Sequence, residues 1–237
     1  MILQELVKYY EALAERGEIA LDGWSKEKVS YSLELDREGK LLKILSLGVE
    51  EKNGKGKTVR KPKLMEVPER VVSRTSGVSA NFLCDNAKFM LGISGDASDR
   101  KSRKYFNATK EKLIQGCDGP AARALKKFFQ SWDPSRAEEL SELKDKEYRD
   151  EITKAGNLVF SIEGEYAQEI PELKQAWESW RKKQGKKKGE EKRQGKKKQK
   201  EINEYGRCLV TGEFSEIVRK HTQIKGIKNA KASGAAL

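Results

Sequence analysis

Histidine and cysteine, which often carry catalysis or bind transition metals, are sparse in this sequence. The chain of 237 residues has one histidine, His221, and three cysteines, Cys84, Cys117 and Cys208. Cys208 and His221 are thirteen residues apart and have no evident partners, so their spacing does not match a metal site. The odd number and wide spacing of the cysteines predict no disulfide framework, which suits a reducing compartment.

Three aspartates in polar stretches, Asp96, Asp99 and Asp118, are candidates for a magnesium site. Aspartates in such stretches more often form turns, so this pattern is weak. Segment 54–58, Gly-Lys-Gly-Lys-Thr, is similar to the end of a phosphate-binding loop, but it lacks the required earlier glycine. We therefore expect no catalytic residue, no metal and no cofactor, with a metal-dependent nuclease as the alternative.

Basic residues are concentrated in three segments, 52–63, 100–112 and 181–200. The last contains twelve lysines and arginines and two glutamates, a net charge of +10 out of +12 for the chain, so the rest is nearly neutral. Lysine and arginine neutralise phosphates, which favours salt-dependent nucleic-acid binding. A charge run is as often a solvated surface, and both interpretations stay open for 181–200. Contact is favoured for 52–63, which contains Arg60, Lys61 and Lys63.

A small polar stretch, Arg-Thr-Ser-Gly-Val-Ser-Ala-Asn, follows at residues 74–81. Gly77 permits close approach of the backbone to a ligand. The side chains of Arg74, Thr75, Ser76, Asn81 and Asn86 suit phosphates or base edges. Composition alone favours an ordinary helix cap at Ser79 and Asn81 by about two to one.

In the N-terminal third of the chain, apolar residues recur at regular spacing. Apolar residues at helical spacing over 2–14, ended by Gly17, predict a helix. Alternation over 29–35 predicts a half-buried strand, and 41–47 the return strand of a hairpin whose turn contains Gly39.

The next segments are less regular. We expect 50–63 to be a mobile basic connection, followed by a short strand with Val67, Val71 and Val72. Ser79 is then predicted to cap a helix that Gly92 ends. That helix would bury Phe82, Leu83, Ala87, Met90 and Leu91.

The middle of the chain is predicted to be helical. One helix covers 105–114, and a second begins near Pro120 and carries Leu125, Phe128, Phe129 and Trp132. A third begins after Pro134, where Ser135 and Glu138 have the spacing of a capping box. It is expected to face the core with Leu140, Leu143 and Ile152.

Strands are predicted again at 158–162 and 206–210, with a helix from Pro171 to Trp180 between them. Both strands should return to the sheet of the first hairpin. Segment 183–203 has no apolar face and is expected to be a disordered basic insert. The predicted fold class is α+β: a small antiparallel sheet with an N-terminal helix and a helical middle region.

Two classes of protein are excluded by hydropathy. No apolar run approaches the ~18 residues of a membrane span. The first residues lack the basic start and long apolar stretch of a signal peptide. We therefore expect a cytoplasmic protein without a membrane partner.

Several spaced stretches resemble one protein family, the large subunit of the type I-C CRISPR surveillance complex, Cascade. The resemblance runs along the chain apart from the basic insert. It is carried by Met1–Tyr10, Leu13–Gly17, Arg74–Val78, Asn81–Leu83, Asp85–Ala87, Cys208–Gly212 and Ile224–Ile227. Two features depart from the family pattern: the insert at 187–200, and Cys84 where the family often has tryptophan.

The resemblance implies a non-catalytic subunit that reads the protospacer-adjacent motif on target double-stranded DNA. It also implies help with duplex opening, R-loop formation and recruitment of the helicase-nuclease effector. Partners would be the other Cascade subunits and, indirectly, the guide RNA, whose pairing carries most of the sequence specificity. Residues 1–237 would be the N-terminal domain of a longer large subunit whose helical C-terminal domain is absent here.

The expected DNA-binding residues combine the basic cluster with the polar stretch. Which residue touches which base stays open at this point. The enzymatic alternative is a nuclease or a guide-RNA-processing ribonuclease. A second alternative is a scaffold that binds protein subunits and makes few contacts with nucleic acid. The expected set is Arg60, Lys61, Lys63, Arg74, Thr75, Ser76, Gly77, Asn81 and Asn86.

Overall fold

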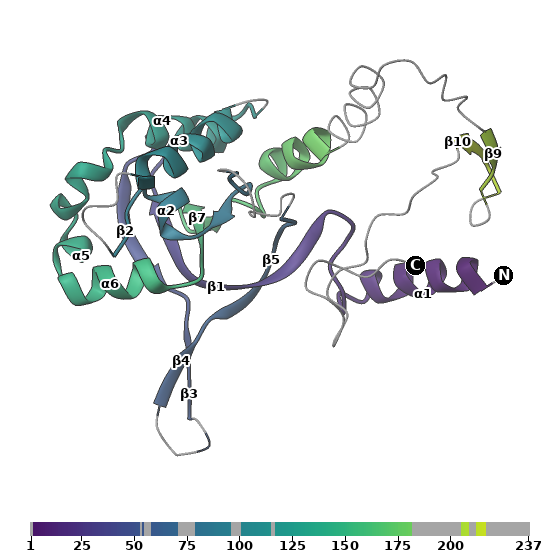
Figure 1. The fold of residues 1–237 in the computed structure, drawn as a ribbon, viewed down its shortest axis with the longest axis horizontal. Coiled ribbons are helices and arrows are strands. Elements are labelled where there is room, and N and C mark those ends of the chain that lie inside the picture. Colours follow the sequence, from purple (N-terminus) through teal and green to yellow (C-terminus); the bar gives the residue numbers. More distant parts are fainter. Residues whose placement is uncertain are drawn as a thin grey trace. The chain divides into compact units, whose positions relative to one another are not determined.

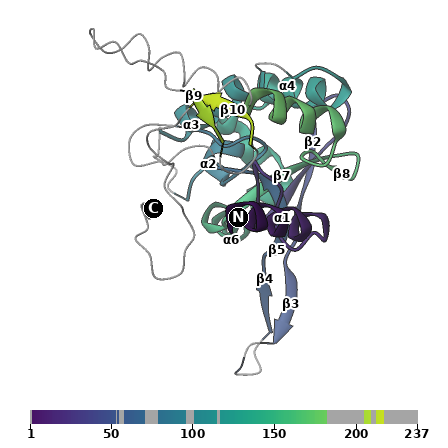
Figure 2. The same ribbon diagram turned by 90° about the vertical axis from the view of Figure 1, so that its right-hand side faces the viewer.

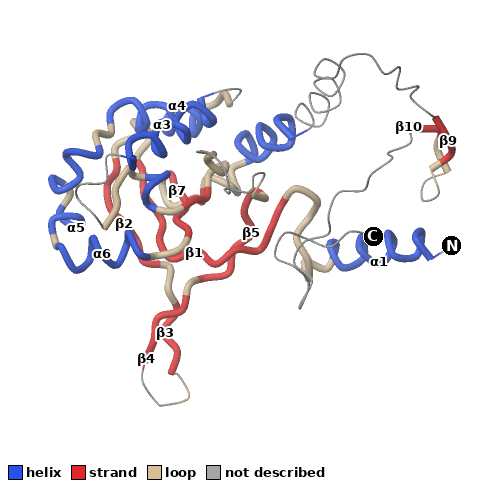
Figure 3. The backbone as a smooth tube through the Cα atoms, viewed as in Figure 1, coloured by secondary structure: helices blue, strands red, loops and turns tan. Residues whose placement is uncertain are grey.

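The computed structural model describes residues 2–52, 54, 58–70, 79–95, 101–114, 117–181, 205–208 and 212–216. The chain divides into two compact units, one of residues 20–191 and the other of residues 1–19 with 192–237. The larger unit holds a mixed sheet with a layer of helices, so the predicted α+β class is confirmed (Figures 1 and 3).

The sheet of the larger unit has six strands in the order β2-β1-β7-β6, with β5 paired to β1 and β8 paired to β7. Its centre is the long strand β1 (Trp24–Leu35). The second half of β1 pairs antiparallel with β2 (Leu41–Ser46), and the first half with β5 (Lys63–Pro68). The predicted hairpin is confirmed, and Gly39 in its turn has a φ of +76°.

Strand β7 (Asn157–Ile162) lies parallel to β1, although the sequence predicted an antiparallel sheet. All six of its residues are buried, as expected for a strand covered on both faces. A parallel pair needs a long crossover, which the helical middle of the chain provides. The short strands β6 (Cys84–Asp85) and β8 (Glu165–Tyr166) complete the sheet.

A β-hairpin inserted between β2 and β5 replaces the mobile connection predicted for 50–63. Strands β3 (Val49–Lys52) and β4 (Thr58–Lys61) pair antiparallel and project from the sheet (Figures 1 and 2). We call residues 49–61 the arm. The prediction did not foresee that the charges pair across two strands: Glu50 lies directly opposite Arg60 in the hairpin.

The helical layer consists of short elements that pack on the sheet through one aromatic core. Phe128 lies at its centre, with ring centroids 5.3 Å from Phe160 on β7 and 5.2 Å from Phe129. The elements are α2 (Ala87–Met90), α3 (Lys101–Ile114), α4 (Pro120–Ser131), the 3-10 helix η1 (Pro134–Glu139), α5 (Ser141–Lys144), α6 (Lys146–Lys154) and a helix over 171–181.

Two helix predictions are wrong in detail. Residues 79–86 contain turns and strand β6 instead of a helix, and Asn86 rather than Ser79 caps the short helix α2. After Pro134 the chain forms three short helices, and the Asp133 side chain caps the first by accepting from the N–H of Ser135. Aspartate competes well for an N-cap, which the capping-box pattern did not take into account.

The smaller unit contains helix α1 (Ile2–Glu15), which confirms the predicted N-terminal helix. It also contains a two-stranded sheet of β9 (Tyr205–Arg207) and β10 (Phe214–Glu216). The strand predicted at 206–210 therefore pairs with β10 and does not return to the main sheet. Its partner β10 begins seven residues after β9 ends, so it is reached at a lower entropic cost than a distant sheet.

No helix among the described residues is both long and apolar enough to span a membrane. Segment 183–203, predicted to be a disordered insert, lies outside the described residues.

Candidate nucleic-acid interface

The basic residues predicted to contact DNA occupy the arm and the strand that follows it. Arg60 and Lys61 lie on β4, and Lys63 is the first residue of β5. All three are exposed to solvent. These three residues are neighbours in the sequence, at the end of β4 and the start of β5.

Acidic residues on the facing strand partly neutralise the arm. The Arg60 guanidinium lies 3.1 Å from the Glu50 carboxylate, and the Lys61 ammonium 2.5 Å from that of Glu51. Both pairs are exposed, so each contributes only about 0–1 kcal/mol to stability. The cations can therefore exchange these partners for phosphates at low cost, but the arm is less positive than the basic run suggested.

Lys63 has a different environment. Its ammonium lies 5.0 Å from the ring centroid of Tyr166 on β8, a cation–π contact. The contact directs the Lys63 side chain toward β8, whereas Arg60 and Lys61 pair within the arm. Tyr166 had no sequence signal for this role, because nothing in its neighbourhood indicates that β7 and β8 approach β5.

Four of the predicted site residues, Arg74, Thr75, Ser76 and Gly77, lie outside the described residues. The chain on the N-terminal side of this segment is fixed by Arg70, whose guanidinium donates to the Asn157 side chain over 2.8 Å. Asn157 in turn donates to the backbone carbonyl of Lys28 on β1 over 3.1 Å. The residue that precedes segment 71–78 is therefore linked by hydrogen bonds to the two central strands, β7 and β1.

The chain on the C-terminal side is fixed by a buried carboxylate. Asp85, 1% exposed, accepts hydrogen bonds from the backbone N–H groups of Asn81, over 3.0 Å, and Asn86, over 2.8 Å. Asp85 belongs to β6, which pairs with β7. Both ends of segment 71–78 are thus held on the same strand, β7, through Asn157 and Asp85.

Of the two predicted asparagines, Asn81 is buried and Asn86 is half-buried. Asn81 is 2% exposed, and its side-chain nitrogen has no hydrogen-bond partner within the described part of the chain. The Asn86 side chain accepts from the N–H of Lys88 over 3.2 Å and so caps α2. In this geometry both residues fix the end of the polar segment.

Two of the three cysteines, Cys84 and Cys117, are buried. Burial, followed by the nearby Asp85 carboxylate, raises the pKa of Cys84 to about 12, and burial also raises the pKa of Cys117. Both thiols are therefore neutral near pH 7 and poor nucleophiles. Cys84 packs among Val29, Met65, Val67 and Val159 on the second face of the sheet.

Metal-binding geometry is not found in the described ranges, where no three His, Cys, Asp or Glu side chains group together. Of the sequence-derived metal candidates, Asp96, Asp99 and His221 lie outside those ranges. Asp118 is exposed and lies 3.7 Å from the Lys126 ammonium. The candidate residues that the structure describes are therefore the basic side chains of the arm and of β5, together with Arg70, Asn81, Asp85 and Asn86, which lie on either side of segment 71–78.

A comparison with protein families gives a match along most of the chain. A family model described as CRISPR-associated protein (Cas_Csd1) matches residues 6–237. The chain belongs to the Csd1 family of CRISPR-associated proteins. Among curated proteins, no match to the chain is found.

Csd1-family membership makes the chain a Cascade-type protein, and other Cascade subunits are its implied partners. The resemblance inferred from the sequence is thereby confirmed at the level of the family. The matched range includes the arm, the polar segment and the fixing residues Arg70, Asp85 and Asn157.

Proposed function

We propose that this Csd1-family chain reads the protospacer-adjacent motif on target double-stranded DNA as a non-catalytic part of a type I-C Cascade. In this proposal, residues 1–237 form the N-terminal domain of the large subunit. The domain aids duplex opening and R-loop formation and helps to recruit the helicase-nuclease, in the cytoplasm. Guide RNA is an indirect partner, because its pairing with the target carries most of the specificity.

The double attachment of segment 71–78 to β7 carries the proposal. A motif reader has to hold a few side chains in register with base edges, and the hydrogen bonds of Arg70 and Asn81 hold the residues on either side of the segment in place. Arg74, Thr75, Ser76 and Gly77 are assigned the direct contacts. Asn81 and Asn86 belong to the same site and position its C-terminal end.

The arm supplies the second half of the proposed contact. Strand β5 connects the arm to the polar segment, and its six residues span roughly 20 Å. That length corresponds to about six base pairs at ~3.4 Å per pair. One duplex can therefore meet phosphate contacts from Arg60, Lys61 and Lys63 at one end of β5 and motif contacts at the other.

The test compares the assembled complex on targets with permuted adjacent motifs. Ser76→Ala should weaken the preference for the correct motif by about 1–3 kcal/mol if its hydroxyl contacts a base edge. Asp133→Ala serves as the control, because Asp133 caps η1 outside the proposed site, so its loss should lower stability by about 0.5–2 kcal/mol and leave the preference in place. Unchanged motif preference in the Ser76→Ala complex would contradict the site assignment.

A second assay addresses the enzymatic alternative, a metal-dependent nuclease or a guide-RNA-processing ribonuclease. Labelled duplex, single-stranded DNA and RNA are incubated with the chain and magnesium or manganese. We expect no cleavage above that of a buffer control. Cleavage that is abolished by replacing Asp96, Asp99 or His221 would overturn the proposed non-catalytic role.

A further inference from the structure

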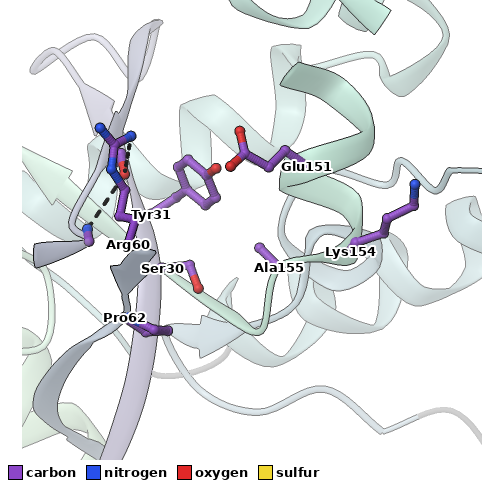
Figure 4. A pocket seen from close by; sticks show the side chains of 9 residues that line it. Ser30, Tyr31, Arg60, Pro62, Glu151, Lys154 and Ala155 are labelled. Atoms are coloured by element: carbon purple, nitrogen blue, oxygen red, sulfur yellow. Dashed lines mark hydrogen bonds between the residues drawn. The ribbon is translucent and has the colours of Figure 1, made fainter. Parts of the chain in front are cut away.

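A pocket of about 310 Å³ lies between the base of the arm and helix α6 (Figure 4). Strand β1 supplies Ser30 and Tyr31 to its wall, and Arg60 and Pro62 come from the chain at the end of the arm. Glu151, Lys154 and Ala155 line the opposite side. Every one of these residues belongs to the larger compact unit.

The polar groups of the pocket are of three kinds. Two cations, Arg60 and Lys154, come from opposite walls. The Tyr31 hydroxyl and the Glu151 carboxylate point toward each other between those walls (Figure 4). Burial, reinforced by the negative charge of Glu151, raises the pKa of Tyr31 to about 12, so its hydroxyl stays protonated near pH 7.

Arg60 has donors available for a ligand. One terminal nitrogen lies 3.1 Å from the Glu50 carboxylate, and the other lies 3.5 Å from the Ser46 hydroxyl, a long contact. Since guanidinium carries five N–H donors in a planar fork, these two contacts leave room for a phosphate. Pro62 and Ala155 add apolar surface to the wall.

The size and the chemistry together restrict the ligand. Ligand pockets range from about 300 to 1,000 Å³, so this pocket accepts one small ligand rather than a stretch of polymer. A cation suits a phosphate, an apolar wall suits the face of a base, and a carboxylate accepts hydrogen bonds from an exocyclic amino group. A single nucleotide combines these three features.

We propose that this pocket binds one nucleotide that has swung out of the opened target duplex, with preference for a base that bears an exocyclic amino group. Arg60 binds the phosphate, and Glu151 accepts from the amino group of the base. The inference rests on the proposed function, because duplex opening supplies the unpaired nucleotide. A base in the opened duplex has already lost its hydrogen bonds to the partner strand, which lowers the cost of its capture.

The test titrates the full chain with deoxycytidine and thymidine 5′-monophosphates and follows the aromatic NMR signals of Tyr31. We expect saturable shifts with the cytidine nucleotide and weaker binding of the thymidine nucleotide. Glu151→Gln should reduce this discrimination at least about fivefold, since glutamine offers a donor as well as an acceptor. Glu147→Gln on the same helix is the matched control, because Glu147 does not line this pocket.

A second variant tests the cavity itself. Ala155→Leu fills space at the wall and should abolish the binding of both nucleotides, with circular dichroism used to verify the fold. Absence of saturable binding to the wild-type chain, or equal effects of the Glu147 and Glu151 variants, would overturn the pocket proposal.

Motif preference of the assembled complex is measured separately. If that preference persists without nucleotide binding, the pocket proposal alone fails. If nucleotide binding persists without motif preference, the motif-reading proposal fails.

Discussion

The backbone N–H of Asn81 donates a hydrogen bond over 3.0 Å to the carboxylate of Asp85, inside the larger unit. The second oxygen of the same carboxylate accepts from the N–H of Asn86 over 2.8 Å. One buried side chain thereby fixes the turn that joins segment 71–78 to β6 and α2. Hydrogen bonds to an ionised acceptor are about twice as strong as neutral ones, so this turn is rigid relative to an ordinary loop.

Replacing Asp85 with asparagine should lower the free energy of unfolding by about 1–3 kcal/mol. The amide nitrogen of asparagine cannot accept, so one of the two backbone N–H groups loses its partner. Urea denaturation of the full chain measures the effect. Asp118→Asn is the control, because Asp118 is exposed and its ion pair with Lys126 should contribute less than about 1 kcal/mol. Equal losses in both variants would contradict a special role for Asp85.

The arm should respond in opposite directions to charge changes on its two strands. Lys61→Gln removes a phosphate-binding cation and should weaken binding to all duplexes alike, with a lower salt slope. Glu51→Gln releases Lys61 from its ion pair and should strengthen binding. Fluorescence anisotropy of the assembled complex at several salt concentrations measures both. If the Glu51→Gln complex instead bound DNA more weakly, Lys61 would contact the DNA while it is paired with Glu51, and not as a free cation.

The sequence predicted those elements whose periodicity is local. Alternation predicted residues 29–35 of β1, although 31–35 are all buried rather than half-buried. Pro120 marked the start of α4, and helical spacing predicted the helix from Pro171 to Trp180. The parallel placement of β7 was missed, because no local pattern states which strand lies beside a buried one. The arm was missed because its charges pair across the hairpin, and that register exists only after folding.

The candidate site, like the fold, was predicted from the sequence only in part. Basic residues can be recognised in a sequence by their type alone, and Arg60, Lys61 and Lys63 are exposed to solvent. Asn81 was predicted from its polar side chain, yet burial turns that side chain inward. Arg70 and Asn157 had no sequence signal, since they are 87 positions apart and meet only because β5 and β7 flank β1.

Helix α6 and its neighbour α5 protect an edge of the sheet. The Tyr148 hydroxyl donates to the backbone carbonyl of Ile44 on β2 over 3.2 Å, and the Glu142 carboxylate accepts from the N–H of Ile44 over 3.4 Å. An unprotected edge strand is a template for pairing with another chain. Tyr148→Phe should therefore lower stability by about 0.5–1.5 kcal/mol and increase light scattering on heating. Tyr9→Phe, at an exposed position on α1, should change neither quantity.

Tyr31 should make the stability of the larger unit fall at alkaline pH. Burial first, and then the Glu151 carboxylate, raises its pKa from 10.0 to about 12. Above pH 10 the tyrosine of the unfolded chain loses its proton while that of the folded chain keeps it, so the unfolded state binds fewer protons and is favoured as pH rises. The contribution is present below pH 10 and is lost between pH 10 and about 12.

Denaturation curves measured across this pH range, with tyrosinate absorbance followed in parallel, test the assignment. Cys84, whose pKa is also raised to about 12, adds to the same decline, so the difference between wild type and Tyr31→Phe isolates the tyrosine. That variant should lose less stability on going from pH 10 to pH 12. Glu151→Gln should shift part of the tyrosinate absorbance to lower pH, because it removes the second largest cause of the shift. Absorbance that rises at the same pH in wild type and in Glu151→Gln would mean that Tyr31 and Glu151 do not interact in the wall of the pocket.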